Sequence, residues 1–430
     1  MSTTHHDALE TRDPVTREAA LMAALPGQIR AAQAVPALAE RLAGIDAAAI
    51  TSRAALARVP VTRKGELLER QKAGRASATA WDPFGGFSAI GWRALRGVRP
   101  ARRVYQSPGP IYEPEGAAAD YWRVARALFA AGFRAGDLVH NSFSYHLTPG
   151  AWIMESGALA LDCTVFPGGV GNTEMQLQAM AELRADGYAG TPSFLRILVE
   201  KAAESGVALP HLKKALVSGE AFPAALRDWL AERGITAYQC YATADVGLIA
   251  YETAAREGLV VDEGVIVEIV RPGTDDPVPE PQAGQAPEVG EVVVTVLQPD
   301  YPLVRFGTGD LSAVLPGPCP TGRTNRRIKG WLGRADQTAK VRGMFVHPSQ
   351  VAEVLRRHPE LTKARLVVEG EMANDRMTLK AETTASADGL SDAVAASVRD
   401  VTKLRGDIVL CAPGSLPNDG KVIEDLRKIG

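Results

Sequence analysis

The sequence predicts an α/β protein with a large N-terminal domain of mixed sheets and helices and a smaller α+β C-terminal domain. Three observations lead to this prediction. The chain has 430 residues, which is enough for two or three domains at about 150 residues each. From about Asp137, short apolar runs alternate with helical stretches, which is the pattern of a largely parallel sheet. After Gly333 and Arg334 a second, shorter series of strands and helices begins.

The N-terminal domain is expected to span residues 1–333. Residues 15–60 are rich in Ala, Leu and Arg at helical spacing and predict two or three packed helices. The alternating region then contains apolar strand-like runs and helical stretches, in the order 159–167, 173–185, 214–218 and 223–233. Farther on, β-branched strands at 265–270 and 291–297 flank a loop rich in Pro, Gly, Asp and Glu. This pattern predicts a long hairpin in a β-rich subdomain.

The C-terminal domain is expected to span residues 334–430, with a hinge near residues 334–336. Helical periodicity predicts two helices at 349–357 and 390–404. Short β-branched and apolar runs predict strands at 337–341, 364–369, 376–382 and 407–410. This order of elements predicts a small α+β lid.

The composition is that of an ordinary globular protein, with 46% apolar and 23% charged residues and a formal net charge of −2. Such a charge gives no overall attraction to nucleic acid or to an anionic membrane, so neither is expected as a partner. The first twelve residues lack the apolar segment of a secretory signal. The four cysteines lie far apart without a CxxC pair, which favours a reduced, cytoplasmic location; they are Cys163, Cys240, Cys319 and Cys411.

A glycine-rich turn is the strongest local signal in the sequence. It precedes a helical stretch that Asn172 or Thr173 is able to cap, and it reads Gly168-Gly169-Val170-Gly171-Asn172-Thr173-Glu174. By itself such a turn usually connects a strand to a helix without further function. Other motifs follow it in order: Thr191-Pro192-Ser193-Phe194, Ser218-Gly219-Glu220-Ala221, Tyr241-Ala242-Thr243-Ala244-Asp245, Val304-Arg305-Phe306-Gly307-Thr308-Gly309-Asp310-Leu311, Gly333-Arg334-Ala335-Asp336, Val341-Arg342-Gly343, His347-Pro348-Ser349-Gln350 and Leu416-Pro417-Asn418-Asp419-Gly420-Lys421.

In this order and spacing, the motifs resemble the phenylacetate–coenzyme A ligase family of the adenylate-forming superfamily. The resemblance extends from about Asp137 to the C-terminus. It implies an N-terminal adenylation domain that binds nucleotide and acid, and a mobile C-terminal lid that turns about Asp336. It also implies a ligase that activates an aryl or related carboxylic acid as an acyl-adenylate and transfers it to coenzyme A. The implied cofactors are ATP, Mg²⁺ and coenzyme A, and the implied assembly is a homodimer.

The resemblance also implies which residues bind the nucleotide: Ser218, Gly219, Glu220, Ala221, Tyr241, Ala242, Thr243, Asp310 and Arg334. The Asp310 carboxylate is suited to accept hydrogen bonds from both ribose hydroxyls, with Arg334 as a nearby donor. Without the family pattern these two residues would be interpreted as a surface ion pair. Asp245 is implied as the Mg²⁺ ligand, although the family usually has Glu there and Gly at the position of Ala242.

The walls of the acid-binding pocket are implied less sharply, as Phe143, Tyr145, His146, Gly168, Gly169 and Pro192. His146 replaces a small residue of the family pattern; it contacts a ring substituent, narrows the pocket or is structural. Gly343 is implied beside the tunnel for the pantetheine arm of coenzyme A. Lys421 is implied as the catalytic lysine, because an ammonium carried by a closing lid stabilises charge that develops during adenylation. Alone, it would be interpreted as an ordinary surface lysine.

Residues 104–114 depart most from the family pattern. The family has a Ser/Thr/Gly-rich loop ending in Lys-Pro, which wraps the β- and γ-phosphates, whereas this chain retains Ser107, Gly109 and Pro114 from that pattern. Pro108 and Pro110 lack the backbone N–H groups that such a loop donates, and Glu113 stands where the lysine is usual. The sequence therefore predicts a weaker hold on the triphosphate.

This departure leaves two alternatives to the coenzyme A ligase. One is a catalytically degenerate relative that binds an aryl acid, AMP or an adenylate without efficient ligation. The other is a ligase that loads the thiol of a carrier protein. Retention of Asp310, Arg334 and Lys421 favours an active enzyme, because a protein that merely binds its ligand has little use for a lysine on a lid.

Overall fold

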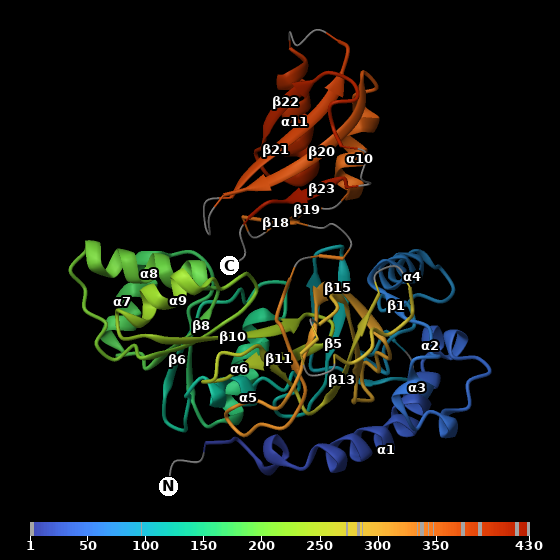
Figure 1. Ribbon diagram of the computed structural model, residues 1–430, viewed down its shortest axis with the longest axis vertical. Coiled ribbons are helices and arrows are strands. Elements are labelled where there is room, and N and C mark those ends of the chain that lie inside the picture. The colour runs from blue at the N-terminus through green and yellow to red at the C-terminus, as the bar shows by residue number, and fades with distance from the viewer. Residues whose placement is uncertain are drawn as a thin grey trace. The chain divides into compact units, whose positions relative to one another are not determined.

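The computed structural model describes residues 4–95, 97–271, 274–281, 284–285, 287–332, 334–335, 339–342, 344–346, 348–370, 375–385, 389–417 and 421–427 (Figure 1). The chain divides into two compact units, Met1–Gly333 and Arg334–Gly430. The nucleotide- and acid-binding role of the first unit and the lid role of the second stay predictions.

The first unit begins with helices, as predicted for residues 15–60. They are α1 (Pro14–Gln33), α2 (Pro36–Arg41) and α3 (Arg53–Leu56), and α4 (Lys64–Ala76) follows after a short strand. Helix α1 starts there because the Asp13 carboxylate accepts a hydrogen bond from the Thr16 N–H and Pro14 occupies the first turn. Its apolar face, including Leu25 and Ile29, is fully buried in the core that it shares with a four-stranded sheet.

The central element of the first unit is a mixed sheet with nine strands within the described residues, in the order β16-β17-β12-β11-β10-β9-β8-β6-β7. The strands are β6 (Leu138–Asn141), β7 (Thr164–Pro167), β8 (Gly187–Gly190), β9 (Lys214–Val217), β10 (Thr236–Thr243), β11 (Gly247–Glu252), β12 (Leu259–Val261), β16 (Val314–Leu315) and β17 (Arg327–Ile328). Strands β6 to β10 are parallel to one another, and β10 is antiparallel to β11. Helix α5 (Ala125–Ala130) precedes β6, and the helices between the parallel strands are α6 (Gly150–Ala160), α7 (Thr173–Glu182), α8 (Pro192–Glu204) and α9 (Ala224–Ala231).

This sheet confirms the predicted α/β fold class and differs from the prediction in one element. The apolar run 159–167 comprises the end of helix α6 and, after a short turn, strand β7. Both segments are rich in apolar residues although neither is fully buried, so composition alone does not separate them.

The β-rich part of the first unit is a sheet of four strands within the described residues, in the order β1-β15-β14-β13. They are β1 (Thr62–Arg63), β13 (Val265–Val270), β14 (Gly290–Val296) and β15 (Phe306–Ser312), and β13 pairs with β14 as the predicted hairpin. Both strands of this hairpin are buried along their whole length. Two short pairs complete the unit: β2 (Ile90–Gly91) with β3 (Arg99–Pro100), and β4 (Arg103–Ser107) with β5 (Ile111–Glu115).

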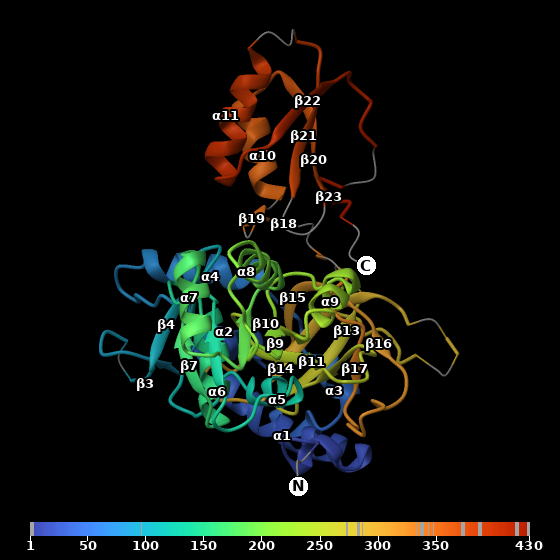
Figure 2. The ribbon, with the colours of Figure 1, turned by 90° about the vertical axis from the view of Figure 1, so that its left-hand side faces the viewer.

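The second unit is an α+β sandwich, as predicted. Within the described residues its sheet has the order β22-β21-β20-β23, with β20 (Leu361–Glu369), β21 (Arg376–Thr383), β22 (Asp407–Cys411) and β23 (Ile423–Asp425). Helices α10 (Pro348–Arg357) and α11 (Leu390–Thr402) cover one face of this sheet (Figure 2). A hairpin of β18 (Ala339–Val341) and β19 (Met344–Val346) precedes them.

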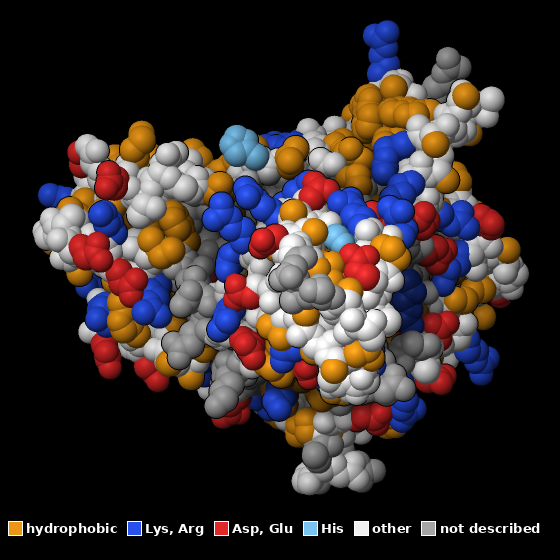
Figure 3. Space-filling view, turned by 90° about the horizontal axis from the view of Figure 1, so that it is seen from above, with side chains coloured by type: hydrophobic (Ala, Val, Ile, Leu, Met, Phe, Trp, Pro, Cys, Tyr) orange, Lys and Arg blue, Asp and Glu red, His pale blue; other side chains and the backbone are white. Residues whose placement is uncertain are grey.

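Basic and acidic side chains alternate over the face of the molecule shown in Figure 3, in agreement with the net charge of −2. Among the described helices, none combines the length and the apolar character that a membrane span requires. The four cysteines are free thiols. Burial raises the pKa of Cys163 to about 11 and that of Cys240 to about 12, so both stay protonated and weakly nucleophilic at neutral pH.

Candidate functional site

Five neighbouring parallel strands of the large sheet end at one edge, in the order β10-β9-β8-β6-β7. In open α/β sheets, ligands bind at the carboxyl ends of the strands. The residues predicted from the sequence follow these ends: Phe143, Tyr145 and His146 after β6, Gly168 and Gly169 after β7, Pro192 after β8, Ser218, Gly219, Glu220 and Ala221 after β9, and Tyr241, Ala242 and Thr243 at the end of β10. The topology therefore brings segments from a hundred residues of chain to one edge.

A buried polar network fixes the aromatic loop that follows β6. The Asn141 side chain donates a hydrogen bond to the Tyr145 hydroxyl (2.9 Å), and its carbonyl oxygen accepts the Phe143 N–H (3.2 Å). The Tyr145 hydroxyl donates to a Glu155 carboxylate oxygen (2.8 Å). Burial and the Glu155 carboxylate raise the pKa of Tyr145, which stays neutral. Phe143 and Tyr145 are half-buried with defined orientations, whereas the predicted His146 is exposed.

Gln176 organises the glycine turn that follows β7. Its amide nitrogen donates to the carbonyl oxygens of Gly169 (2.8 Å) and Gly171 (2.7 Å), so its amide oxygen faces His140 Nε2 at 2.8 Å. His140 therefore donates from Nε2, and burial lowers the pKa of its imidazole, which keeps it neutral. A Cβ atom on Gly168 would lie within 2.8 Å of both Gln176 Oε1 and His140 Nε2. Glycine is thus required at the centre of this loop.

The turn after β9 is held by bonds to its neighbours on both sides. The Ser218 hydroxyl donates to the Cys240 carbonyl oxygen on β10 (2.8 Å). A Glu220 carboxylate oxygen accepts the Ser193 N–H at the start of helix α8 (2.7 Å). Gly219 between them has a φ of +85°, which glycine adopts without strain. These two hydrogen bonds tie the turn to β10 and to helix α8, and the adenine-binding role of the turn stays a prediction.

The predicted ribose-binding carboxylate joins the two sheets of the first unit. The Tyr241 hydroxyl donates to Asp310 Oδ2 (2.8 Å), and the Trp331 indole N–H donates to Asp310 Oδ1 (3.0 Å). Asp310 is buried and Tyr241 is half-buried. These two neutral donors come from β10 and from the segment after β17, and they fix the orientation of the carboxylate.

A second carboxylate lies in the turn between β10 and β11. Asp245 is buried, and Thr243 Oγ1 accepts the Val246 N–H (3.2 Å) to close this turn. The ammonium of Lys64, the first residue of α4, donates to Asp245 Oδ2 (2.8 Å). Asp245 Oδ1 is buried with no hydrogen-bond partner among the described residues. One carboxylate oxygen is thus paired with a cation, and the other is available for a ligand.

The altered segment 104–114 forms the tight hairpin β4–β5, in which Ser107 pairs with Ile111. Its Glu113 side chain is fully buried; Oε1 accepts the Ser107 hydroxyl (2.6 Å), and Oε2 has no partner within the described part of the chain. Burial and the nearby Asp245 charge raise the pKa of Glu113 well above its usual value, and Lys64 opposes this effect. Sequence analysis placed a plain negative charge here, whereas burial favours the protonated carboxyl.

Two comparisons with known proteins bear on this site. A phenylacetate–coenzyme A ligase from Aromatoleum evansii is 30% identical over 349 residues, which are 77% of this chain and 73% of that protein. The chain belongs to the phenylacetate–coenzyme A ligase family. A member from Thermus thermophilus is 28% identical over 427 residues, 90% of each chain. No family model matches the sequence.

Solved structures agree with the fold expected of this family. A 2-hydroxyisobutyryl-CoA ligase, crystallised with 2-HIB-AMP and CoA in the thioesterification state, gives a TM-score of 0.80 at 24% identity over 99% of this chain and 93% of that one. The same ligase with R3-HIB-AMP in the postadenylation state gives 0.67 at 25% identity over 97% and 91%. Both are adenylate-forming folds, so the predicted fold class is confirmed.

The family's ligases imply a Mg²⁺ ion, and the residues at Asp245 fit one. Among the described residues, no group of three or more His, Cys, Asp or Glu side chains is arranged to hold a metal. Mg²⁺ at phosphate sites usually takes one or two protein carboxylates and completes its shell with phosphates and water. The buried, unpartnered Asp245 Oδ1 meets that requirement.

Four predicted residues belong to the second unit. Arg334 is half-buried and Lys421 is exposed there. Asp336, the expected hinge, and Gly343, the expected tunnel residue, lie outside the described residues. The roles of all four stay predictions.

Sequence reasoning missed Lys64, Asn141, Glu155 and Trp331. Asn141 carried a usable signal, because it is a polar residue that ends the apolar strand β6. Lys64 carried none, since its contact with Asp245 spans 181 residues of sequence and depends on how the sheets pack. Trp331 lies 21 residues after Asp310 and reaches it across a loop.

Proposed function

We propose that the protein is an AMP-forming ligase that joins a carboxylic acid to the thiol of coenzyme A. The acid's carboxylate oxygen bonds to the α-phosphorus of ATP and pyrophosphate leaves. The thiol sulfur then bonds to the carbonyl carbon of the acyl-adenylate, and AMP leaves. One observation carries the proposal: the carboxyl edge of the large sheet gathers an aromatic loop, a glycine turn and Asp245, and Tyr241 at the same edge holds Asp310 of the neighbouring sheet.

In this proposal the carboxylate of Asp310 accepts hydrogen bonds from the ribose hydroxyls. Tyr241 and Trp331 hold the carboxylate in place before the nucleotide arrives, which lowers the ordering cost of binding. The rigid turn of Ser218 and Gly219 brings backbone close to the flat adenine base. These groups bind and orient the nucleotide without chemical change.

Asp245 would hold Mg²⁺ through its unpartnered oxygen. When bound, the ion neutralises negative charge on the phosphate oxygens. Lys64 holds the other oxygen of Asp245 and places a positive charge in the same region. Part of the cationic role that the altered hairpin has lost is thereby supplied by helix α4.

Lys421 is the proposed catalytic residue of adenylation. The acid oxygen, the α-phosphate and the departing pyrophosphate all carry negative charge in that transition state, and an ammonium stabilises it there. Its position on a separate unit fits a group that is delivered when the site closes and withdrawn before thiol transfer.

An aromatic acid is the proposed substrate. Phe143 and Tyr145 supply half-buried ring surfaces beside the glycine turn, and Tyr145 packs edge-on against Trp152 with ring centroids 5.1 Å apart. Flat apolar walls bounded by glycine suit a planar ring.

Acid-dependent exchange of labelled pyrophosphate into ATP tests this proposal, because it reports adenylation without any thiol. We expect exchange with at least one member of a panel of aryl, heteroaryl and short acyl acids. Lys421→Ala is expected to reduce the exchange by about 10²-fold or more while thiol transfer from a supplied adenylate persists. Equal loss of both half-reactions would contradict the role of Lys421.

One observation favours a second function, that of a protein that binds an adenylate without making one. Glu113 is buried beside Asp245, where the family's phosphate loop has a lysine. Absence of exchange with every acid at high Mg²⁺·ATP, together with tight binding of AMP, would support this alternative and contradict the ligase.

A further inference from the structure

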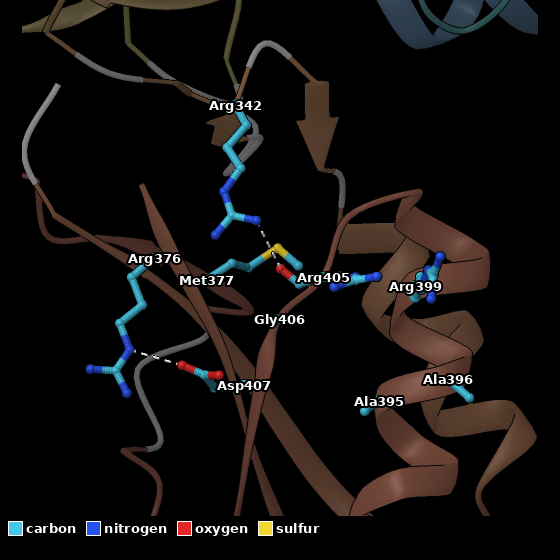
Figure 4. A pocket seen from close by; sticks show the side chains of 9 residues that line it. All are labelled: Arg342, Arg376, Met377, Ala395, Ala396, Arg399, Arg405, Gly406 and Asp407. Carbon is cyan, nitrogen blue, oxygen red and sulfur yellow. Dashed lines mark hydrogen bonds and ion pairs between the residues drawn. The ribbon is translucent and has the colours of Figure 1, made fainter. Parts of the chain in front are cut away.

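The second unit contains a cavity of about 550 Å³ that the proposed reaction has not yet used (Figure 4). It is lined by Arg342, Arg376, Met377, Ala395, Ala396, Arg399, Arg405, Gly406 and Asp407. We call it the arginine cavity. Four of these nine residues are arginines and one is acidic, in a chain whose formal net charge is −2. All four arginines are solvent-exposed, so this excess of positive charge attracts small anions from solution.

The fold brings the four arginines together from separate segments. Arg342 follows strand β18, Arg376 begins β21, Arg399 lies in the last turn of α11, and Arg405 lies in the connection from α11 to β22. The small side chains Ala395 and Ala396 precede Arg399 on α11 and leave the space open. Figure 4 shows the Arg405 side chain extending toward helix α11, which carries Arg399.

Arg342 is held in place without losing its charge. Its guanidinium donates to the carbonyl oxygens of Asp375 (2.9 and 3.1 Å) and Arg405 (3.4 Å), which are neutral acceptors. Its φ of +48° lies in the left-handed region, which an arginine seldom adopts. The two-residue turn between β18 and β19 imposes this conformation, because Val341 pairs with Met344.

The remaining charges are compensated unevenly. Arg376 pairs with Asp407 at 2.9 Å near the surface. Within the part of the chain that the structure describes, the side chains of Arg399 and Arg405 have neither an ion pair nor a hydrogen bond. Two guanidinium groups that have no partner among the described residues therefore line the cavity beside a third that neutral carbonyls orient.

Planar guanidinium groups bind phosphate through paired N–H donors, which makes clustered arginines typical of phosphate sites. The volume is in the range of small-molecule sites, roughly 300–1,000 Å³. We propose that the arginine cavity binds the phosphate groups of the coenzyme A nucleotide. This inference rests on the proposed function, in which ATP binds in the first unit and coenzyme A is the remaining polyphosphate substrate. The volume of the cavity fits a small phosphate ester better than the convex surface of a carrier protein.

Thioester formation with coenzyme A and with dephospho-coenzyme A, which lacks the 3′-phosphate, tests the inference. We expect the wild type to prefer coenzyme A. Arg399→Ala and Arg405→Ala are each expected to raise the KM for coenzyme A about tenfold and to reduce that preference. Arg356→Ala is the matched control, because it removes an exposed arginine of α10 that does not line the cavity. It should retain the wild-type KM and preference.

A binding measurement separates this inference from the proposed function. Titration of the full chain with adenosine 3′,5′-bisphosphate in a calorimeter needs no turnover, and we expect binding that Arg399→Ala weakens and Arg356→Ala does not. Pyrophosphate exchange without such binding would overturn the proposal that the arginine cavity binds the phosphates of coenzyme A. The proposal that the protein is a ligase would be unaffected. Equal weakening by all three variants, or loss of transfer to an acidic carrier protein with an unchanged KM for coenzyme A, would also overturn it.

Discussion

The two carboxylate clusters at the sheet edge are built in opposite ways. Asp310 is oriented by two neutral donors, Tyr241 and Trp331, one on each carboxylate oxygen. Asp245 and Glu113 instead are buried near each other with the Lys64 ammonium, and each keeps one oxygen without a partner among the described residues. The first cluster therefore has a neutral donor on each carboxylate oxygen, whereas the second combines two buried carboxyl groups with one ammonium.

In the proposed function, the two clusters meet two different requirements of one nucleotide. Ribose hydroxyls are neutral, so a prearranged carboxylate is sufficient to bind them. A triphosphate with Mg²⁺ brings charges of both signs. The cluster of Asp245, Glu113 and Lys64 has carboxyl oxygens without a partner among the described residues, and these are able to bind a cation. In this chain the family's cationic loop has become a hairpin with an inward carboxyl, and the cation comes from helix α4.

The largest expected effect comes from removing the oriented carboxylate. Asp310→Ala should weaken AMP binding about 100-fold, because two hydrogen bonds to a charged group are lost. Acid binding should change far less. Calorimetry with AMP and with the best acid measures both affinities. Tyr241→Phe, which removes one orienting bond, should give a smaller loss in the same direction. Unchanged AMP affinity in Asp310→Ala would remove Asp310 from the site.

A smaller effect is expected from breaking the charged cluster. Lys64→Ala leaves the buried Asp245 without its cation and should lower the free energy of unfolding by about 2 kcal/mol, less than for a fully buried pair because Lys64 is about one-third exposed. Urea denaturation measures this. The matched control is Lys72→Ala on the same helix, whose ion pair with Glu69 lies at the surface, and it should change stability by less than about 0.5 kcal/mol.

The smallest effect concerns Glu113 and depends on pH. Because its pKa is raised in the folded state, the stability that Glu113 contributes is complete below its ordinary pKa and is lost as the pH rises through the folded value. Glu113→Gln keeps the acceptor for the Ser107 hydroxyl and removes the charge. It should therefore stabilise the protein by about 1 kcal/mol at pH 8 and by less at pH 5.

Unfolding at both pH values, with the exposed Glu69→Gln as control, measures this difference. A stabilisation that is larger at pH 5 than at pH 8 would show that the Glu113 carboxyl is ionised in the folded protein. The double variant with Glu113→Gln and Lys64→Ala should change the free energy of unfolding by less than the sum of the two single changes. The effects are not additive because the two residues belong to one cluster.

The sequence predicted the architecture well where local pattern determines it. Alternating strands and helices gave the parallel sheet, and motifs after strand ends gave Tyr241, Ser218 and Gly168, because parallel strands direct their carboxyl ends to one edge. The run 159–167 was assigned as one element because helix and strand are equally apolar there.

Properties that arise from packing were beyond sequence reasoning. The sequence around Lys64 does not indicate its contact with Asp245, because that contact requires helix α4 to lie against the turn after β10. The raised pKa of Glu113 depends on complete burial, and a charged residue type gives no sign of burial in the sequence. The arginines of the second unit also lie far apart in sequence and meet through the fold.

The bond from Trp331 to Asp310 gives the protein an optical reporter of its own. The emission of an indole depends on the groups around its N–H, and this N–H contacts the carboxylate that a ribose would approach. The chain has six tryptophans. Of these, Trp331 donates to Asp310, so we expect its emission wavelength and intensity to change when a nucleotide binds there. Nucleotide binding and release become visible by fluorescence in the unlabelled enzyme, on the timescale of a single turnover.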